Sequence, residues 1–280
     1  MDVIERASDL DGLPRGRVLV PTMGALHEGH VSLIRLGAAA ARERSLVGGC
    51  LVSIFINPTQ FNDPADFKRY PRTLSEDLDA CEAAGASAVY APPVEDVYPP
   101  GVDVLQPVVP IPGVGKGLED AGRPGHFEGV CKVVRRLFDL TKPAAAVFGE
   151  KDWQQLAVMC AMVERDELGV EIIPGPTVRE PDGLALSSRN ELLNPADRPK
   201  ALGLVRSLDA AQQEPTPMEA ETAMHRVLSQ HGINDPHYAT IRDAGALAPP
   251  RAGEPARALV AATVGGVRLL DNAAWQSPRA

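Results

Sequence analysis

Short apolar runs alternate with helix-like segments along most of the chain. The runs predict strands at residues 17–20, 49–56, 88–91 and 144–148, with further extended pieces at 170–173 and 177–179. The segments between them have the apolar spacing of helices, at 31–44, 74–84, 127–141 and 152–167. Because strands that alternate with helices form parallel sheets covered on both faces, we expect a Rossmann-like α/β domain. Ligands of such sheets bind at the carboxyl ends of the strands.

The pattern changes after Asn194. Two helix-like segments come first, at 195–213 and 217–231, and three strand-like runs follow, at 237–242, 256–264 and 266–270. Helices followed by consecutive strands predict a small α+β domain. We therefore expect a Rossmann-like domain over residues 1–176 and a small α+β domain over residues 177–280. The proline- and glycine-rich stretch 92–125 is expected to be mostly loop.

Composition narrows the class of protein. Of the 280 residues 44% are hydrophobic but only 4% are aromatic, so Ala, Val, Leu and Ile must build the core. The net charge of −9 disfavours nucleic acid as a partner. No apolar run approaches the length of about 20 residues that a membrane span needs. The four cysteines form no Cys-x-x-Cys pair, which disfavours a zinc ribbon. We expect a cytoplasmic enzyme that binds neither membranes nor nucleic acid.

The first candidate site is the segment 21–30, Pro-Thr-Met-Gly-Ala-Leu-His-Glu-Gly-His, between a predicted strand and a predicted helix. The first turn of a helix offers unpaired backbone N–H groups and favours negative charge, so a phosphate fits there. His27 and His30 can donate hydrogen bonds to its oxygens. Two alternatives remain open, namely a metal site with a distant third ligand and a purely structural helix start.

Polar residues also follow the next strand and precede a later helix. Asn57 and Gln60 offer neutral donors and acceptors suited to a small substrate with hydroxyl groups, although a plain Asn-Pro turn is the alternative. Arg123 stands before the helix expected at 127–141, where a surface arginine is often without function.

Two further turns carry cations and hydroxyls. Lys151 follows a strand and a glycine and precedes a helix, which is the arrangement of an anion site. Asp152 can cap that helix, with Gln155 in the capping-box position. The run Ser187-Ser188-Arg189 can clamp an anion, since arginine binds two phosphate oxygens at once, or it can be an ordinary loop. Together the turns predict a nucleoside-triphosphate site beside a small-molecule pocket, without a P-loop or dinucleotide-binding motif.

At these residues the chain resembles the pantothenate synthetase (pantoate–β-alanine ligase) family, within the nucleotidyltransferases that carry a His-x-Gly-His motif. The similarity runs from Val20 to Asn272. It is carried by segment 21–30 and by these further motifs: Ser-Ile-Phe-Ile-Asn-Pro-Thr-Gln-Phe, Tyr-Pro-Arg-Thr, Arg-Pro-Gly-His-Phe, Phe-Gly-Glu-Lys-Asp-Trp-Gln-Gln-Leu and Asp-Gly-Leu-Ala-Leu-Ser-Ser-Arg-Asn. Thr59 and Trp153 depart from the residues usual in the family, and their effect on the pocket is not set by the sequence.

The resemblance implies a two-step reaction with ATP as a substrate and Mg²⁺ as its companion. Pantoate and ATP give pantoyl adenylate and pyrophosphate, and β-alanine then displaces AMP to give pantothenate. The resemblance also implies a homodimer and a carboxyl-terminal domain that acts as a lid. The Mg²⁺ ligands are not assigned.

The family pattern also implies a role for each matched residue. His27, His30 and Lys151 are expected to be catalytic. The expected ATP-binding residues are Met23, Gly24, His27, His30, Gly149, Lys151, Asp152, Val178, Ser187, Ser188 and Arg189. The residues expected around pantoate and β-alanine are Met23, Gln60, Gln155, Asn57 and Arg123.

Two other functions stay open at this point. One is an adenylyltransferase that stops at nucleotide transfer, which a requirement for β-alanine distinguishes. The other is a nucleotide-binding regulatory protein without turnover, against which the intact Lys151 and histidine pair argue.

Overall fold

The computed structural model describes residues 1–60, 64–102 and 104–276 and divides them between two compact units. The first unit comprises residues 1–110, 123–150 and 158–175, and the second comprises 111–122, 151–157 and 176–280. Phe61, the last residue of the motif Ser-Ile-Phe-Ile-Asn-Pro-Thr-Gln-Phe, lies outside the described residues. Each unit has its own sheet.

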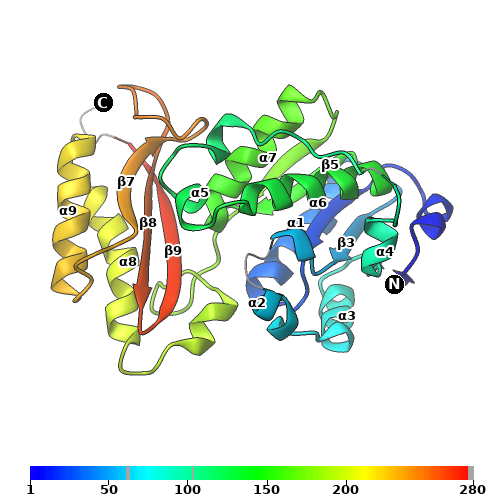
Figure 1. Cartoon of the computed structure of the whole chain (residues 1–280), viewed down its shortest axis with the longest axis horizontal. Coiled ribbons are helices and arrows are strands. Elements are labelled where there is room, and N and C mark those ends of the chain that lie inside the picture. Colours follow the sequence, from blue (N-terminus) through cyan, green and yellow to red (C-terminus); the bar gives the residue numbers. More distant parts are fainter. Residues whose placement is uncertain (61–63, 103, 277–280) are drawn as a thin grey trace. The chain divides into compact units, whose positions relative to one another are not determined.

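The first unit is built on a six-stranded parallel sheet with the order β1-β4-β3-β2-β5-β6 (Figure 1). Its strands are β1 (Asp2–Ile4), β2 (Val18–Thr22), β3 (Cys50–Ile54), β4 (Ala88–Tyr90), β5 (Ala145–Gly149) and β6 (Glu171–Gly175). The Rossmann-like fold expected from the sequence is confirmed. Strand β1 was not expected, because three residues at the edge of the sheet are too few to show a period.

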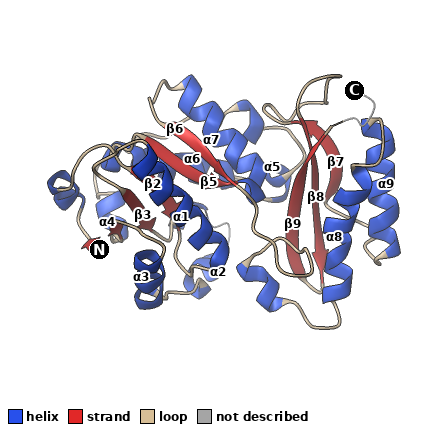
Figure 2. Ribbon diagram, turned by 180° about the vertical axis from the view of Figure 1, so that it is seen from behind, coloured by secondary structure: helices blue, strands red, loops and turns tan. Residues whose placement is uncertain are grey.

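Helices cover both faces of this sheet. Figures 1 and 2 view the molecule from opposite sides and show α6 (His126–Thr141) in front of the sheet in one and α1 (Glu28–Glu43) in front in the other. The remaining helices that lie wholly in the first unit are α2 (Pro64–Arg69), α3 (Leu74–Ala83) and α4 (Val94–Val97). Ile34 and Ala38 of α1 pack with Cys81 of α3 against the valines of β2 and β3. Small side chains let α1 approach the sheet closely, as the scarcity of aromatic residues predicted.

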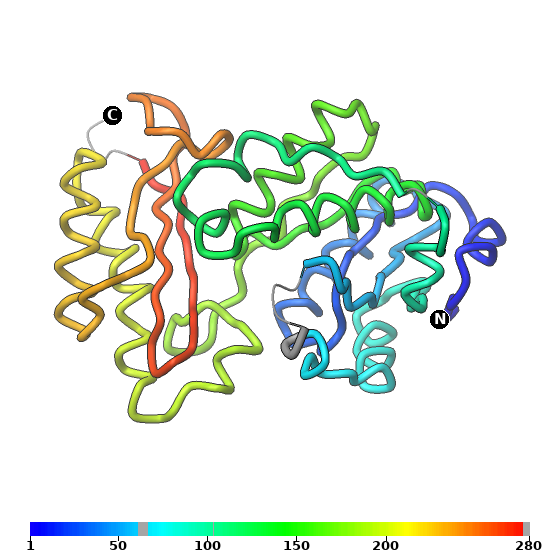
Figure 3. The backbone as a smooth tube through the Cα atoms, in the orientation of Figure 1, coloured from blue at the N-terminus to red at the C-terminus, as the bar shows by residue number. Residues whose placement is uncertain are grey.

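The second unit is a three-stranded antiparallel sheet covered by two helices, α8 (Arg198–Ala211) and α9 (Pro217–Gln230) (Figure 1). Its strands are β7 (Tyr238–Asp243), β8 (Ala256–Val264) and β9 (Val267–Trp275). The turn between β8 and β9 is Gly265-Gly266, both with positive φ, as a tight hairpin requires (Figure 3). The short helix α5 (Glu119–Gly122) also belongs to this unit, and α7 (Trp153–Arg165) contributes residues to both.

Strand β9 is longer than the sequence pattern predicted. The expected run ended at residue 270, whereas the pairing with β8 continues to Trp275 opposite Ala256. Asp271 and Asn272 interrupt the apolar pattern of this strand, so the pattern ends before them. Both can nevertheless be buried in it, because each is satisfied by hydrogen bonds inside the unit.

All four cysteines are free thiols, and Cys50, Cys81 and Cys131 are buried while Cys160 is exposed. Burial raises the pKa of each of the three buried thiols to about 12, so they stay protonated and unreactive. Among the helices that the structure describes, none has both the length and the apolar character to cross a bilayer.

Candidate active site

Three neighbouring strands of the parallel sheet end in turns that carry the predicted site residues. Strand β2 lies between β3 and β5, and the chain leaves it toward β3 and β4 on one side before returning to β5 on the other. This reversal is a topological switch point, where ligands of open α/β sheets bind. The turn after β2 holds His27 and His30, the turn after β3 holds Asn57 and Gln60, and Lys151 follows two residues after β5.

The two histidines start helix α1 and cap it reciprocally. The backbone N–H of Gly29 donates to His27 Nδ1 at 3.1 Å, and the N–H of His27 donates to His30 Nδ1 at 3.3 Å. Their ring centroids lie 4.1 Å apart. Since each Nδ1 accepts a hydrogen bond, the neutral rings carry their proton on Nε2. The helix-start alternative is therefore correct about geometry: both Nδ1 atoms serve the cap, and the ring N–H of each histidine is at Nε2.

A metal held by the histidine pair has no support in the described residues, among which no three His, Cys, Asp or Glu side chains gather to bind an ion.

Met23 and Gly24 lie just before the pair of histidines in the chain. Gly24 has φ of +80°, a conformation that costs a side-chain-bearing residue strain. A Cβ at Gly24 would also lie 2.9 Å from a carboxylate oxygen of Asp77.

Asp77 holds the turn that carries the histidines, a role that the sequence did not reveal. This side chain of α3 is 3% exposed and accepts from the backbone N–H of Ala25 at 3.0 Å and of Leu26 at 2.8 Å. Ala25 has φ of 51°, so the bonds hold a strained turn in place. Asp77 lies some fifty residues away in an ordinary helix pattern, and no local signal marks it.

The variant Asp77→Asn should therefore lose both stability and turnover. An amide offers one acceptor where two are needed and leaves a backbone N–H unpaired, which costs about 1–3 kcal/mol of unfolding free energy. Misplacement of the histidines by about 1 Å lowers kcat by roughly 10- to 100-fold. Urea denaturation and steady-state kinetics measure both effects. The exposed Asp79→Asn on the same helix is the matched control, and equal behaviour of the two variants would contradict the assigned role.

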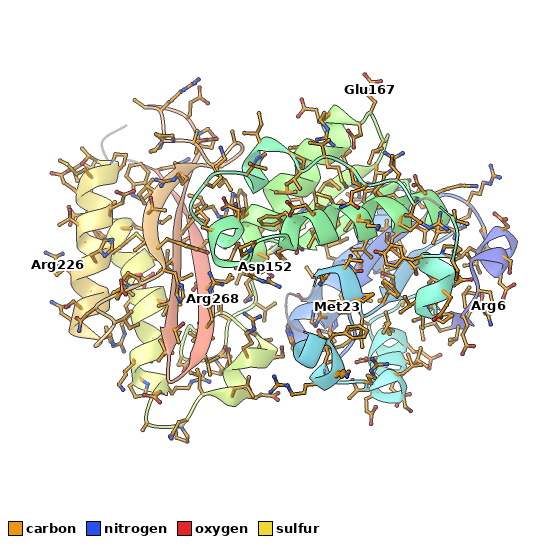
Figure 4. The ribbon with its side chains drawn as sticks, viewed as in Figure 1. Arg6, Met23, Asp152, Glu167, Arg226 and Arg268 are labelled. Carbon is orange, nitrogen blue, oxygen red and sulfur yellow. The ribbon has the colours of Figure 1, made fainter. Side chains whose placement is uncertain are left out.

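Asn57 supports the neighbouring turn. It is 1% exposed, its amide donates to Gln60 Oε1 and to the carbonyl of Gly129, and its oxygen accepts from Thr59 and from the Tyr98 hydroxyl. Gln60 in turn places its amide 2.7 Å from the sulfur of Met23 (labelled in Figure 4). The structure thus brings together Met23 and Gln60, two residues predicted to line the pantoate pocket, and Asn57 holds Gln60 in place.

Arg123 and Gly149 also belong to the first unit. The Arg123 guanidinium lies 3.0 Å from Nε2 of His126, the first residue of α6. Gly149 is the last residue of β5. Contact of either residue with a substrate stays a prediction.

One small pocket of the second unit gathers three of the predicted site residues, Lys151, Ser187 and Arg189. Lys151, Ser187, Arg189 and Arg268 line it, with the backbone and apolar side chains of 184–185 and 269–270 and with Asn190. Ser187 caps the short helix at residues 188–192 by accepting from the N–H of Arg189. None of the described residues that line the pocket is acidic, and three are cationic, as expected of a phosphate site.

The other predicted residues of the second unit are close in sequence to residues of this pocket but do not line it. Ser188 is exposed, Asp152 lies with a carboxylate oxygen 3.9 Å from Lys151 Nζ, and Gln155 is half-buried on α7. The carbonyl of Val178 accepts from the N–H of Leu186 and so ties the two arms of this loop. Their contacts with ATP or pantoate stay predictions.

Sequence reasoning missed Arg268. It stands on β9, where it reads as one outward position of an alternating strand, and it is far along the chain from every recognised motif. Only the folded chain brings Arg268 (labelled in Figure 4) to the pocket that Lys151 and Arg189 also line.

Comparison with known proteins agrees with these features. The family model described as Pantoate-beta-alanine ligase matches residues 6–274. The Pantothenate synthetase of Nocardioides sp. is 49% identical over 91% of this chain and 77% of its own length, and that of Rubrobacter xylanophilus is 48% identical over 91% and 90%. The crystal structure of pantothenate synthetase from Thermus thermophilus is 40% identical with a TM-score of 0.85, covering 98% of this chain and 99% of that one. The ligase from Francisella tularensis, complexed with beta-gamma ATP and beta-alanine, is 31% identical with a TM-score of 0.74 over 98% and 97%.

Proposed function

The chain belongs to the pantoate-beta-alanine ligase family, and from this premise we propose that it joins pantoate to β-alanine at the expense of ATP. The products are pantothenate, AMP and pyrophosphate. The observation that carries this function is the pocket where Lys151, Arg189 and Arg268 meet beside the hydroxyl of Ser187, because such a group of donors suits a polyphosphate.

The reaction needs an activated carboxylate. In the first step an oxygen of the pantoate carboxylate attacks the α-phosphorus of ATP, the bond to the β-phosphate oxygen breaks, and pyrophosphate leaves. In the second step the uncharged amine of β-alanine attacks the carbonyl carbon of the pantoyl adenylate. The carbon–oxygen bond to AMP breaks, and the amine loses a proton as the amide forms.

We assign the side chains to these steps as follows. His27 and His30 donate from Nε2 to the α-phosphate, where charge builds in the transition state. Lys151 with Ser187, Ser188 and Arg189 holds the β- and γ-phosphates and then the leaving pyrophosphate. Met23, Gly24, Gly149, Asp152 and Val178 contact the nucleotide. Met23, Gln60 and Gln155 line the pantoate pocket, and Asn57 and Arg123 support the pantoate and β-alanine end.

We propose that Mg²⁺ accompanies ATP and offsets the charge of its phosphates. This fits the donor set, because Asn190 lines the pocket and its side-chain oxygen is buried with no hydrogen-bond partner among the described residues. A neutral oxygen of this kind suits a water of the hydrated ion, and Mg²⁺ usually keeps several waters.

An isotope experiment tests the adenylate. Pantoate labelled with ¹⁸O in its carboxylate is incubated with ATP, Mg²⁺ and β-alanine. We expect one label in AMP for each pantothenate formed, and pantoate-dependent pyrophosphate release when β-alanine is omitted. Label in inorganic phosphate, with ADP as the nucleotide product, would instead indicate an acyl phosphate and refute this scheme.

We propose that the protein is a homodimer. In the first unit Val102, Leu105 and Val108 leave 57%, 54% and 76% of their surface exposed, which is unusual for three apolar side chains so close in the chain. Light scattering coupled to gel filtration is expected to give twice the mass of 29.8 kDa. A monomer at micromolar concentration contradicts the proposal.

Two further expectations complete the proposed function. We propose that the carboxyl-terminal unit acts as a lid that closes on ATP, which small-angle scattering with and without an ATP analogue tests. We also propose a cytoplasmic location, supported by four free cysteines that suit a reducing compartment and tested by cell fractionation.

A further inference from the structure

Arg268 is fixed in the second unit by a buried ion pair. Its Nη1 and Nη2 donate to the two carboxylate oxygens of Glu119, at 2.7 and 2.6 Å. The side chains are only 19% and 11% exposed. Gly122 lies against the same guanidinium, since a Cβ there would come within 3.2 Å of Nη2. Such a paired guanidinium cannot swing away like a surface arginine.

Glu119 is itself held in place by groups of the second unit. The Tyr238 hydroxyl donates to its Oε1 at 2.9 Å, and its backbone N–H donates to Gln154 Oε1 at 2.8 Å. Burial opposes its charge, but the bonds from Arg268 and Tyr238 outweigh burial and hold the pKa of Glu119 below its ordinary value. The carboxylate is thus ionised at neutral pH and is the fixed counter-ion of Arg268.

One edge of the guanidinium is not used by this pair. Nε of Arg268 is buried and has no hydrogen-bond acceptor among the residues that the structure describes. A buried, unpaired and charged donor is costly. Arg268 lines the same pocket as Lys151, Ser187 and Arg189, so an anion in this pocket would supply the missing acceptor.

We propose that Arg268 is a phosphate-binding residue of this pocket, which presents its Nε edge to a terminal phosphate of ATP while Glu119 holds the opposite edge. The proposal rests on the proposed function and extends it by a residue that no recognised motif contains. Arginine serves such a position better than lysine, because its fork can bind a carboxylate and a phosphate at the same time.

The test measures ATP binding with Mg²⁺ by calorimetry in the absence of pantoate. Arg268→Gln alone strands a buried carboxylate and is expected to be unstable. The double variant Glu119→Gln/Arg268→Gln removes both charges and should regain most of the melting temperature. We expect this double variant to bind ATP roughly 10- to 100-fold more weakly than the unaltered protein. Glu119→Gln alone keeps Arg268 and should change ATP affinity less than about threefold.

Two controls separate phosphate binding from structure and from net charge. Arg242→Gln removes an arginine of the same unit that pairs with Glu221 and does not line the pocket, so its ATP affinity should stay unchanged. Arg268→Lys keeps the positive charge but loses the forked guanidinium, and it should retain only part of the ATP affinity of the unaltered protein. Normal ATP affinity in a folded double variant overturns the proposal, as does an equal loss in Glu119→Gln.

The outcome for Lys151→Ala tells this failure from failure of the proposed function. Weak ATP binding in Lys151→Ala with normal binding in the double variant rejects Arg268 alone. Normal binding in both variants rejects the pocket as a phosphate site, and with it the observation that carries the proposed function.

Discussion

Replacing Lys151 with alanine is expected to lower kcat by about 10²–10³ while the protein stays folded. Lys151 lines a pocket with two arginines, and its side chain is 24% exposed, so its removal leaves no buried partner unpaired. The nearby carboxylate of Asp152, 3.9 Å away, is half exposed and can be solvated by water. The loss therefore falls on the charge that stabilises the phosphates in the transition state.

The kinetic pattern identifies this role. Because Lys151 is proposed to hold the phosphates of bound ATP and to stabilise them further in the transition state, kcat/KM for ATP should fall more than kcat. A rise in KM alone would indicate binding of the ground state only. Lys200→Ala is the matched control, because it removes the same charge from an exposed ion pair with Asp197 in the same unit. Near-normal turnover of Lys151→Ala would refute its assignment.

The fold was largely predictable because its strands are short apolar runs between amphipathic helices. Strand β8 begins and ends at the expected residues, and β2, β3, β4 and β5 lie within two residues of their expected limits. The exceptions have physical causes. Helix α1 begins at Glu28, three residues before its apolar pattern, because histidine side chains cap it. Strand β9 extends beyond its apolar pattern because the buried Asp271 and Asn272 are hydrogen-bonded.

The residues of the candidate site were predictable only where they belong to a continuous sequence motif. The histidine turn and Lys151 follow strands directly, so their positions could be read from the alternation of elements. Asp77 and Arg268 stand in ordinary helix and strand patterns, and only the folded chain brings them to the turns that they serve. Asn57, by contrast, stands inside a recognised motif, but there its side chain supports the site by holding Gln60.

His30 combines structure and chemistry in one ring, and two isosteric variants separate them. Its Nδ1 accepts from the backbone of His27, and its Nε2–H is the proposed donor to the α-phosphate. Asparagine places an oxygen near the position of Nδ1 and has no group at Nε2, whereas glutamine places an amide nitrogen near Nε2 and loses the cap.

We expect His30→Asn to keep the melting temperature and to lower kcat by about 10²–10³. His30→Gln is expected to be less stable by about 1 kcal/mol, as for other lost caps, yet to retain more turnover than His30→Asn. A role confined to capping predicts the reverse order of activity, because asparagine then suffices. Thermal denaturation and single-turnover pyrophosphate release on the same preparations decide between the two orders, since the stability and the rate are measured independently.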